Sequence, residues 1–284
     1  MRENRPSATA EGVAMLRALH QLLDDPKVFD DPLALCIIGR GQGEAMRADP
    51  HQFEASPLAS YLRAFVAARS RCAEDELALA VQRGVAQYVI LGAGLDTFAY
   101  RNPYAEGVIH VFEVDLPVMQ AWKRAHLEEA GIGLPRDLTF APIDFEAQTL
   151  EEGLANTGYD PGKGTFYSWL GVTEYLTIDA VSTTLRLIAS APKGSGVVFD
   201  YMVSPSLLTP SQRARFEALA RRVASQGEPL QAFFDPGRLA SDLKAMGFNR
   251  VEDCGPGEIN SRYFKERSDG LQVGSLSHLV IARV

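Results

Sequence analysis

The sequence predicts an α/β protein built on a doubly wound parallel sheet. From residue 84 onward, short apolar or β-branched runs alternate with helical stretches, which is typical of parallel strands joined by crossover helices. The first run, residues 87–91, stops abruptly at Gly92 and Gly94, and the second, which starts at Val108, ends in Glu113 and Asp115. A glycine turn after the first strand and an acid about 20 residues later are how such folds hold a ribose.

Residues 1–83 are expected to form a helical N-terminal cap. Ser7 or Thr9 can cap a first helix that ends at residues 24–26, and Asp31 lies at the start of a second, short helix. The glycine-rich residues 39–43 are expected to be a loop. A long helix is expected from about Pro57 to Arg83.

The Rossmann-like core is expected over residues 84–203 and 229–284. Its expected strands are 87–91, 108–114, 138–142, 165–170, 196–202, 250–254 and 277–282, and its main helices are 117–129, 178–191 and 235–246. Residues 204–228 interrupt the alternation with a proline-flanked helix, 212–224, at a place where an α/β enzyme would carry a lid. A plain insertion helix is the alternative. We expect the chain, 1–284, to be a single domain.

Composition restricts the partners. The net charge of −8 and the pI near 5.2 argue against a nucleic acid or an anionic membrane as partner, so the substrate is expected to be small. The three cysteines have no C-x-x-C spacing, which argues against a disulfide scaffold and a metal site. The N-terminus lacks the apolar core of a signal peptide and no run reaches membrane-spanning length, so we expect a cytoplasmic protein.

The glycine turn departs from the known phosphate-binding patterns. A dinucleotide fingerprint needs a third glycine where this chain has Thr97, and no lysine of a phosphate loop follows. Asp96 would repel phosphates but could pair with an ammonium group. S-adenosylmethionine, an adenosine joined to a cationic amino acid, fits that description. The alternative is a glycine turn that binds no ligand.

Acidic residues gather at one edge of the predicted sheet. The segments that follow five strands are 92–96, 113–115, 144–145, 169–171 and 200–201, and four of these five contain a carboxylate. Ligands of doubly wound sheets lie outside the carboxyl ends of the strands. These carboxylates suit the hydroxyls and amines of a nucleoside-amino acid.

Several motifs together point to a family. The stretch from Leu91 to Arg101 resembles the first motif of the S-adenosylmethionine-dependent methyltransferases related to leucine carboxyl methyltransferases, whose bacterial branch includes polyketide O-methyltransferases and many actinobacterial members. Further matches follow in order: residues 7–10 with 31–32, 68–71 with 75, 112–117, 169–176 and 260–264. The resemblance implies a class I methyltransferase fold, with seven strands, the last antiparallel, and extra helices that form a cap.

The resemblance also assigns roles to matching positions. By spacing alone, Arg69 belongs to a solvated helix face in which Arg71 pairs with Asp75. The resemblance instead implies that Arg69 holds the methionine carboxylate. The other implied contacts are Gly92, Gly94 and Asp96 with the methionine portion, Asp115 (or Glu113) with the ribose, Asp144 and Phe145 with the adenine, and Gly171 under the sulfonium.

The resemblance implies O-methylation of a small-molecule hydroxyl or carboxylate, in secondary metabolism. Carboxyl methyltransferases of the family tend to carry Glu where this chain has Leu170, so leucine carboxyl methylation does not carry over directly. No histidine stands out as catalytic, and the catalytic residues stay unknown. Candidates to contact the acceptor are Tyr175, Tyr201, Tyr263 and Glu174, with core packing as the alternative for Tyr175. A non-catalytic S-adenosylmethionine-binding protein and a nicotinamide-dependent oxidoreductase are the alternative functions.

Overall fold

The computed structural model describes residues 7–54, 58–145 and 147–284. Its centre is a seven-stranded sheet in the order β3-β2-β1-β4-β5-β7-β6, in which only β7 runs antiparallel to its neighbours. The strands are β1 (Gln87–Leu91), β2 (His110–Asp115), β3 (Leu138–Pro142), β4 (Thr165–Trp169), β5 (Gly196–Met202), β6 (Arg250–Cys254) and β7 (Ser277–Arg283). The doubly wound sheet and its antiparallel last strand are confirmed.

The strand order reverses between β1 and β4. Leu91, at the end of β1, is opposite Val114 of β2 on one side and Trp169 of β4 on the other. The segments that follow these three strands therefore meet at one edge of the sheet. This reversal is where ligands of open α/β sheets bind.

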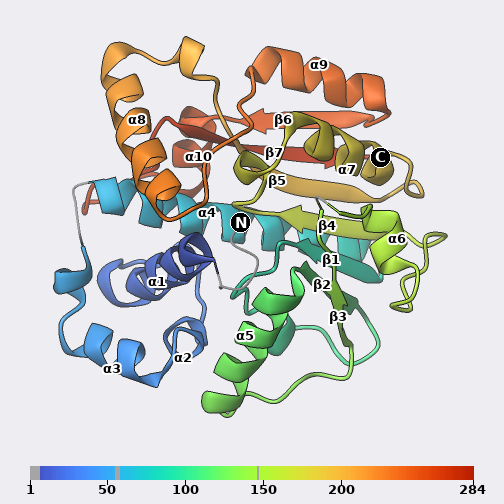
Figure 1. Ribbon diagram of the computed structural model, residues 1–284, viewed down its shortest axis with the longest axis horizontal. Coiled ribbons are helices and arrows are strands. Elements are labelled where there is room, and N and C mark those ends of the chain that lie inside the picture. The colour runs from blue at the N-terminus through green and yellow to red at the C-terminus, as the bar shows by residue number, and fades with distance from the viewer. Residues whose placement is uncertain (1–6, 55–57, 146) are drawn as a thin grey trace.

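Helices cover both faces of the sheet (Figure 1). All residues of β1 and of β5 are buried, which explains why their sequences read as continuous apolar runs. The long helix α4 (Leu58–Gln82) and α10 (Pro256–Tyr263) pack on one face. The opposite face is covered by α6 (Leu150–Leu154), α7 (Ile178–Ala189) and α9 (Pro236–Met246).

The first helices form a separate cluster at one end of the sheet (Figure 1). Helix α1 (Ala8–Leu23) is capped by Ser7, whose hydroxyl accepts a hydrogen bond from Ala10 N. The buried apolar side chains of α1, α2 (Ala34–Ile37) and α3 (Arg40–Ala48) pack together and reach Leu127 of α5 (Pro117–Glu129).

Two expectations for this region were wrong. Residues 39–43 do not form a loop, because α3 begins at Arg40. Glycine is needed there for another reason, since a Cβ atom at Gly43 would lie 2.3 Å from the carbonyl oxygen of Leu35. The second helix begins at Ala34 and not at Asp31, which instead accepts hydrogen bonds as a buried carboxylate. The start of the long helix at Pro57 lies outside the described residues.

The insertion contains α8 (Pro210–Ser225), which is slightly longer than expected and buries Phe216 and Val223.

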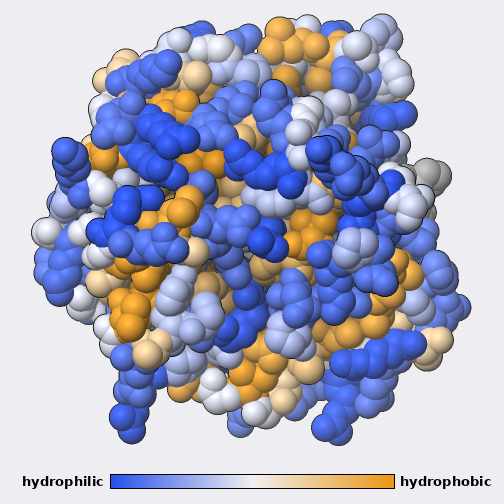
Figure 2. All heavy atoms as spheres, turned by 180° about the vertical axis from the view of Figure 1, so that it is seen from behind, coloured by the Kyte–Doolittle hydropathy of each residue, from blue (hydrophilic) through white to orange (hydrophobic). Residues whose placement is uncertain are grey.

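Figure 2 shows the far face of the molecule mostly covered by hydrophilic residues, with hydrophobic side chains in separate patches. Across the described segments, no helix is both long and apolar enough to cross a membrane.

Candidate functional site

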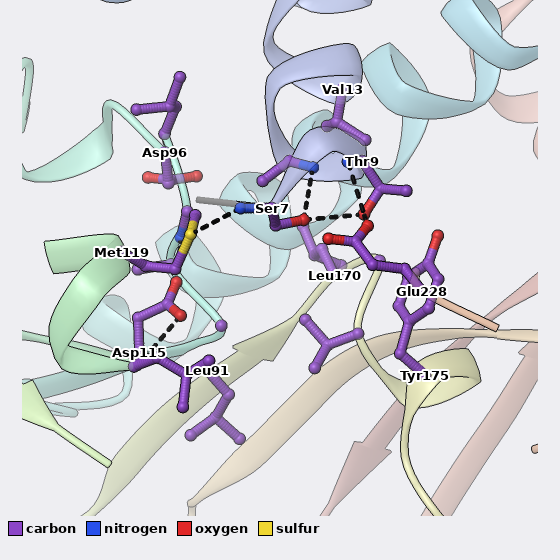
Figure 3. A pocket seen from close by; sticks show the side chains of 18 of the residues that line it. Ser7, Thr9, Val13, Leu91, Asp96, Asp115, Met119, Leu170, Tyr175 and Glu228 are labelled. Atoms are coloured by element: carbon purple, nitrogen blue, oxygen red, sulfur yellow. Dashed lines mark hydrogen bonds between the residues drawn. The ribbon is translucent and has the colours of Figure 1, made fainter. Parts of the chain in front are cut away.

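A pocket of about 200 Å³ lies at the carboxyl ends of β1, β2 and β4, under the start of α1. Figure 3 shows it from close by. All the residues expected to bind the cofactor line it: Arg69, Gly92, Gly94, Asp96, Asp115, Asp144, Phe145 and Gly171. Strand order brings them together, because they come from five separate segments of the chain.

The glycine turn and the end of β2 are joined by hydrogen bonds. Gly94 N donates to Asp115 Oδ2 at 2.6 Å, and Leu116 N donates to Asp115 Oδ1 at 2.8 Å. Gly92 and Gly94 have φ of +66° and +45°, and a Cβ at Gly92 would lie 2.4 Å from Val172 Cγ2. Burial raises the pKa of Asp115 against the opposing effect of these two backbone donors. The carboxylate is thus held in a fixed orientation beside the turn.

Of the two acids at the end of β2, only Asp115 lines the pocket. Glu113 is fully buried and pairs with Lys123 of α5, with 2.7 Å between Oε2 and Nζ. Burial raises the pKa of Glu113 to about 7, although Lys123 opposes the shift. Side-chain alternation does not explain the difference, since residues 113 and 115 share a face of β2. Position along the strand does: Asp115 is the last residue of β2, at the edge where the pocket lies, and Glu113 is in the strand interior.

Arg69 reaches the pocket from α4 and is buried. Its Nη1 donates to Asp200 Oδ2 at 2.7 Å, and Asp200 Oδ1 accepts a hydrogen bond of 2.6 Å from Gly171 N. Burial lowers the pKa of Arg69, but the charges of Asp200 and Glu174 outweigh it and raise the pKa overall. The solvated-face prediction is therefore wrong for Arg69, whereas the exposed pair of Arg71 and Asp75 is confirmed at 2.7 Å.

Gly171 lies directly against the guanidinium of Arg69. Its φ is +72°, and a Cβ atom there would lie 2.5 Å from Arg69 Nη2. Only glycine therefore fits this turn without displacing Arg69.

Glu174 and Tyr175 follow β4 in a short 3-10 turn, η3 (Thr173–Tyr175), and both line the pocket. Within the described part of the chain, Glu174 Oε2 is buried and has no hydrogen-bond partner. Burial and the charge of Asp200 raise the pKa of Glu174, and Arg69 opposes the shift. Burial also raises the pKa of Tyr175.

The start of α1 closes the pocket from above. The Thr9 hydroxyl donates to Glu228 Oε2, to which Thr9 N also donates at 3.2 Å, and Ser7 N contacts the sulfur of Met119 at 3.1 Å. Figure 3 shows Thr9 and Glu228 pointing toward each other near Tyr175. Sequence reasoning identified Ser7 and Thr9 only as helix caps and missed Glu228 and Met119. The match of residues 7–10 to the family was the one available signal.

Two of the candidates for contact with the acceptor lie outside this pocket. The Tyr201 hydroxyl donates to Asp253 Oδ1 at 2.9 Å, and the Tyr263 hydroxyl contacts Asp75 Oδ2 at 3.3 Å. Because side chains alternate along β5, the orientation that brings Asp200 to Arg69 turns Tyr201 to the opposite face.

A seven-stranded sheet of this order, with its last strand antiparallel and an acid-rich pocket at the strand reversal, defines the protein as a class I methyltransferase. The model of the leucine carboxyl methyltransferase family matches residues 10–189, and the chain belongs to this family. Its cofactor is S-adenosylmethionine.

Bacterial relatives agree with this class. The chain is 31% identical over 302 residues, 99% of each chain, to YktD of Bacillus subtilis (strain 168), which is provisionally named an S-adenosyl-L-methionine-dependent methyltransferase. A protein of Mycolicibacterium smegmatis with the same provisional name is 30% identical over 77% of this chain and 71% of its own. A crystal structure of a provisionally named methyltransferase from Thermobifida fusca YX matches this chain with a TM-score of 0.56. The two sequences are 16% identical, and the match covers 98% of this chain and 95% of the other. That last likeness shows the fold alone.

Proposed function

We propose that this S-adenosylmethionine-dependent methyltransferase methylates an oxygen, of a hydroxyl or a carboxylate, on a small molecule. The observation that carries the proposal is the closure of the pocket. Ser7 and Thr9 at the start of α1 and Glu228 after α8 cover it, with Thr9 and Glu228 in direct contact. A pocket covered in part in this way suits a small acceptor better than an extended protein segment.

The described residues that line the pocket suit the cofactor in charge and in hydrogen bonding. In our proposal Arg69 holds the methionine carboxylate and Asp96 its ammonium, because each group has the charge opposite to its ligand. Asp115, oriented by the backbone of residues 94 and 116, accepts hydrogen bonds from the ribose. Glycine at positions 92 and 171 lets the two turns pass close to Val172 and Arg69, which a Cβ atom would meet at 2.4 and 2.5 Å.

The adenine is proposed to lie beside Asp144 and Phe145, which follow β3. Both line the pocket, and the ring of Phe145 lies 6.2 Å from that of Trp169, centroid to centroid. An aromatic side chain at the edge of the pocket can stack on a planar base.

When bound, the cofactor supplies an electrophilic methyl group on a sulfonium. The chain's own contribution is to position the acceptor oxygen and to exclude water, since placement accounts for much of the rate of a displacement reaction. We propose that residues 1–83 act as a cap and 204–228 as a lid on a core of 84–203 and 229–284, together one domain. Glu228, the last residue of the proposed lid, accepts hydrogen bonds from Thr9 N and from the Thr9 hydroxyl, which supports this role for the insertion. Residues 1–6 lie outside the described residues.

Two other functions receive less support. A nicotinamide-dependent oxidoreductase needs a third glycine where Thr97 stands, and the Thr97 hydroxyl is committed to Asp31 at 2.7 Å. A non-catalytic binding protein would bind the cofactor tightly but turn over no acceptor.

Isothermal titration with S-adenosylmethionine, S-adenosylhomocysteine, NAD and NADP is the first test. We expect micromolar binding, about −8 kcal/mol, for the two adenosyl ligands alone. Release of S-adenosylhomocysteine in the presence of small hydroxyl and carboxylate acceptors then tests catalysis. Binding of a nicotinamide cofactor alone would contradict the proposal.

A further inference from the structure

We propose that the acceptor is a neutral hydroxyl compound, not a carboxylate, and that Glu174 accepts the hydroxyl proton during transfer. This inference rests on the proposed function and narrows it.

The lining of the pocket is strongly acidic. Among the described residues, its titratable cations are two arginines, against five carboxyl groups. The arginines are Arg17 and Arg69, and the acids are Asp96, Asp115, Asp144, Glu174 and Glu228. Such a lining attracts the cationic donor but repels an anionic acceptor.

Both arginines already have anionic partners. Arg17 Nε lies 2.8 Å from Asp31 Oδ2, and its Nη2 donates to the Leu95 carbonyl. Arg69 pairs with Asp200 and, in our proposal, also receives the cofactor's own carboxylate. A carboxylate acceptor would therefore enter the pocket with no cation available among the described residues. Apart from the donor's own sulfonium, the acceptor's charge would be buried without a cationic partner among these residues, which is costly, and a neutral acceptor avoids that cost.

Glu174 is placed to act on a hydroxyl. It lines the pocket, and the charges of Arg69 and Asp200 act on its carboxyl group. Both of these residues contact Gly171, which in our proposal lies under the sulfonium. Its Oε2 is buried without a hydrogen-bond partner in the described structure. Buried carboxylate oxygens are normally paired, and an acceptor hydroxyl would supply the missing donor.

The reaction balances with Glu174 as the base. The acceptor oxygen forms a bond to the donor's methyl carbon, and the carbon–sulfur bond breaks with its electron pair left on sulfur. The hydroxyl proton passes to Glu174 Oε2, and the products are a methyl ether and S-adenosylhomocysteine. A carboxylate acceptor is already anionic and would need no such base.

The charged and titratable groups around Glu174 predict the pH dependence. Asp200 on β5 disfavours a negative charge on Glu174, whereas Arg69 on α4 and a hydrogen bond from Thr173 favour one. Tyr175 beside it stays neutral, because burial and the charge of Glu174 raise its pKa. Burial and Asp200 prevail, so the pKa of Glu174 lies above its ordinary value of 4.5. A base must be deprotonated to act, and activity should therefore rise with pH through this raised pKa.

The experiment compares the wild-type chain with Glu174→Gln and Glu174→Asp, using Glu151→Gln as the control. Glu151 is an exposed acid on α6 that does not line this pocket. Binding of S-adenosylhomocysteine is measured first by titration, without an acceptor. Turnover is then measured on matched probes: phenol with benzoate, catechol with salicylate, and benzyl alcohol with phenylacetate.

We expect turnover of the neutral probes only. Glu174→Gln should lower kcat by roughly 100-fold or more and abolish the rise of activity with pH, while its S-adenosylhomocysteine affinity stays within threefold of the wild type. Glu174→Asp should restore part of the rate, and Glu151→Gln should match the wild type.

Two results with the wild type would overturn the inference: a preference for a carboxylate probe, or no turnover of any neutral probe. Two results with Glu174→Gln would also overturn it: an unchanged kcat, or a tenfold or greater loss of S-adenosylhomocysteine affinity. The affinity loss would make Glu174 an anchor for the cofactor's ammonium group. Failure of the wild-type chain to bind S-adenosylhomocysteine would instead contradict the proposed function itself.

Discussion

Arg69 and Asp200, 131 residues apart in the chain, form a buried ion pair of 2.7 Å at the pocket. The pair joins helix α4 to β5. Asp200 also accepts a hydrogen bond from Gly171 N, so the same carboxylate orients the arginine and the turn after β4. A buried, oriented guanidinium is well suited to a second carboxylate, that of the cofactor.

Arg69→Lys should weaken S-adenosylhomocysteine binding by roughly 10- to 100-fold, because it removes the planar fork but keeps the charge. Titration calorimetry measures the change. Arg71→Lys, at the exposed neighbouring ion pair, is the control and should bind like the wild type. Equal affinities for both variants would remove Arg69 from the cofactor site.

Gly171→Ala should lower both stability and cofactor affinity, since the new Cβ would meet the Arg69 guanidinium. Gly107→Ala is the matched control, because its φ is +84° but its Cβ would meet no atom within 4 Å. We expect the control to lose about 1–2 kcal/mol from backbone strain alone and to keep its affinity. Urea denaturation and calorimetry separate the two effects. If Gly171→Ala and Gly107→Ala lost equal stability and equal affinity, contact of residue 171 with Arg69 would not matter.

Asp115→Asn should reduce S-adenosylhomocysteine affinity by roughly 10- to 100-fold, because hydrogen bonds to a charged acceptor are lost. Asp137→Asn is the control: Asp137 Oδ2 also accepts a backbone hydrogen bond, from Gly107 N at 2.7 Å, but at an exposed site away from the pocket. An affinity loss in Glu113→Gln without one in Asp115→Asn would reverse our assignment of the ribose.

Glu113→Gln should change how stability depends on pH. Since burial raises the pKa of Glu113 to about 7, the folded protein keeps this proton while the unfolded chain loses it near 4.5. The wild type should therefore lose stability relative to the variant as pH rises from about 4.5 to about 7, by up to about 3 kcal/mol. Urea denaturation at several pH values measures it. A difference that is constant with pH would mean that Glu113 titrates normally.

Thr9→Val should speed the release of S-adenosylhomocysteine by about tenfold, because a hydrogen bond to a carboxylate is worth about 1.5 kcal/mol. Stopped-flow fluorescence of the bound and released states provides the rate. The control, Thr183→Val, alters an exposed threonine of α7 and should not change release. An unchanged rate in Thr9→Val would mean that the contact with Glu228 does not retain the ligand.

The local sequence pattern was sufficient to predict much of the fold of this protein. The buried runs of β1 and β5, the glycine turn at residues 92–94 and the helix Pro117–Glu129 follow from hydrophobic periodicity and from strong start and stop residues. The class of cofactor could also be predicted from the sequence, because the glycine turn and the acids near the ends of β1 and β2 are close together in the chain. The prediction of a loop at residues 39–43 was wrong. Gly43 is required by close packing against Leu35, which no local sequence pattern reveals.

The tertiary structure alone decided which of the expected residues share the pocket. It separated Asp115 from Glu113, brought Arg69 to Asp200, and turned Tyr201 away from the site. It also joined Thr9 to Glu228 across 219 residues of chain. The physical reason is common to these cases. Periodicity determines which side of an element is buried, but the partner of a buried polar group depends on strand order and on packing between distant segments.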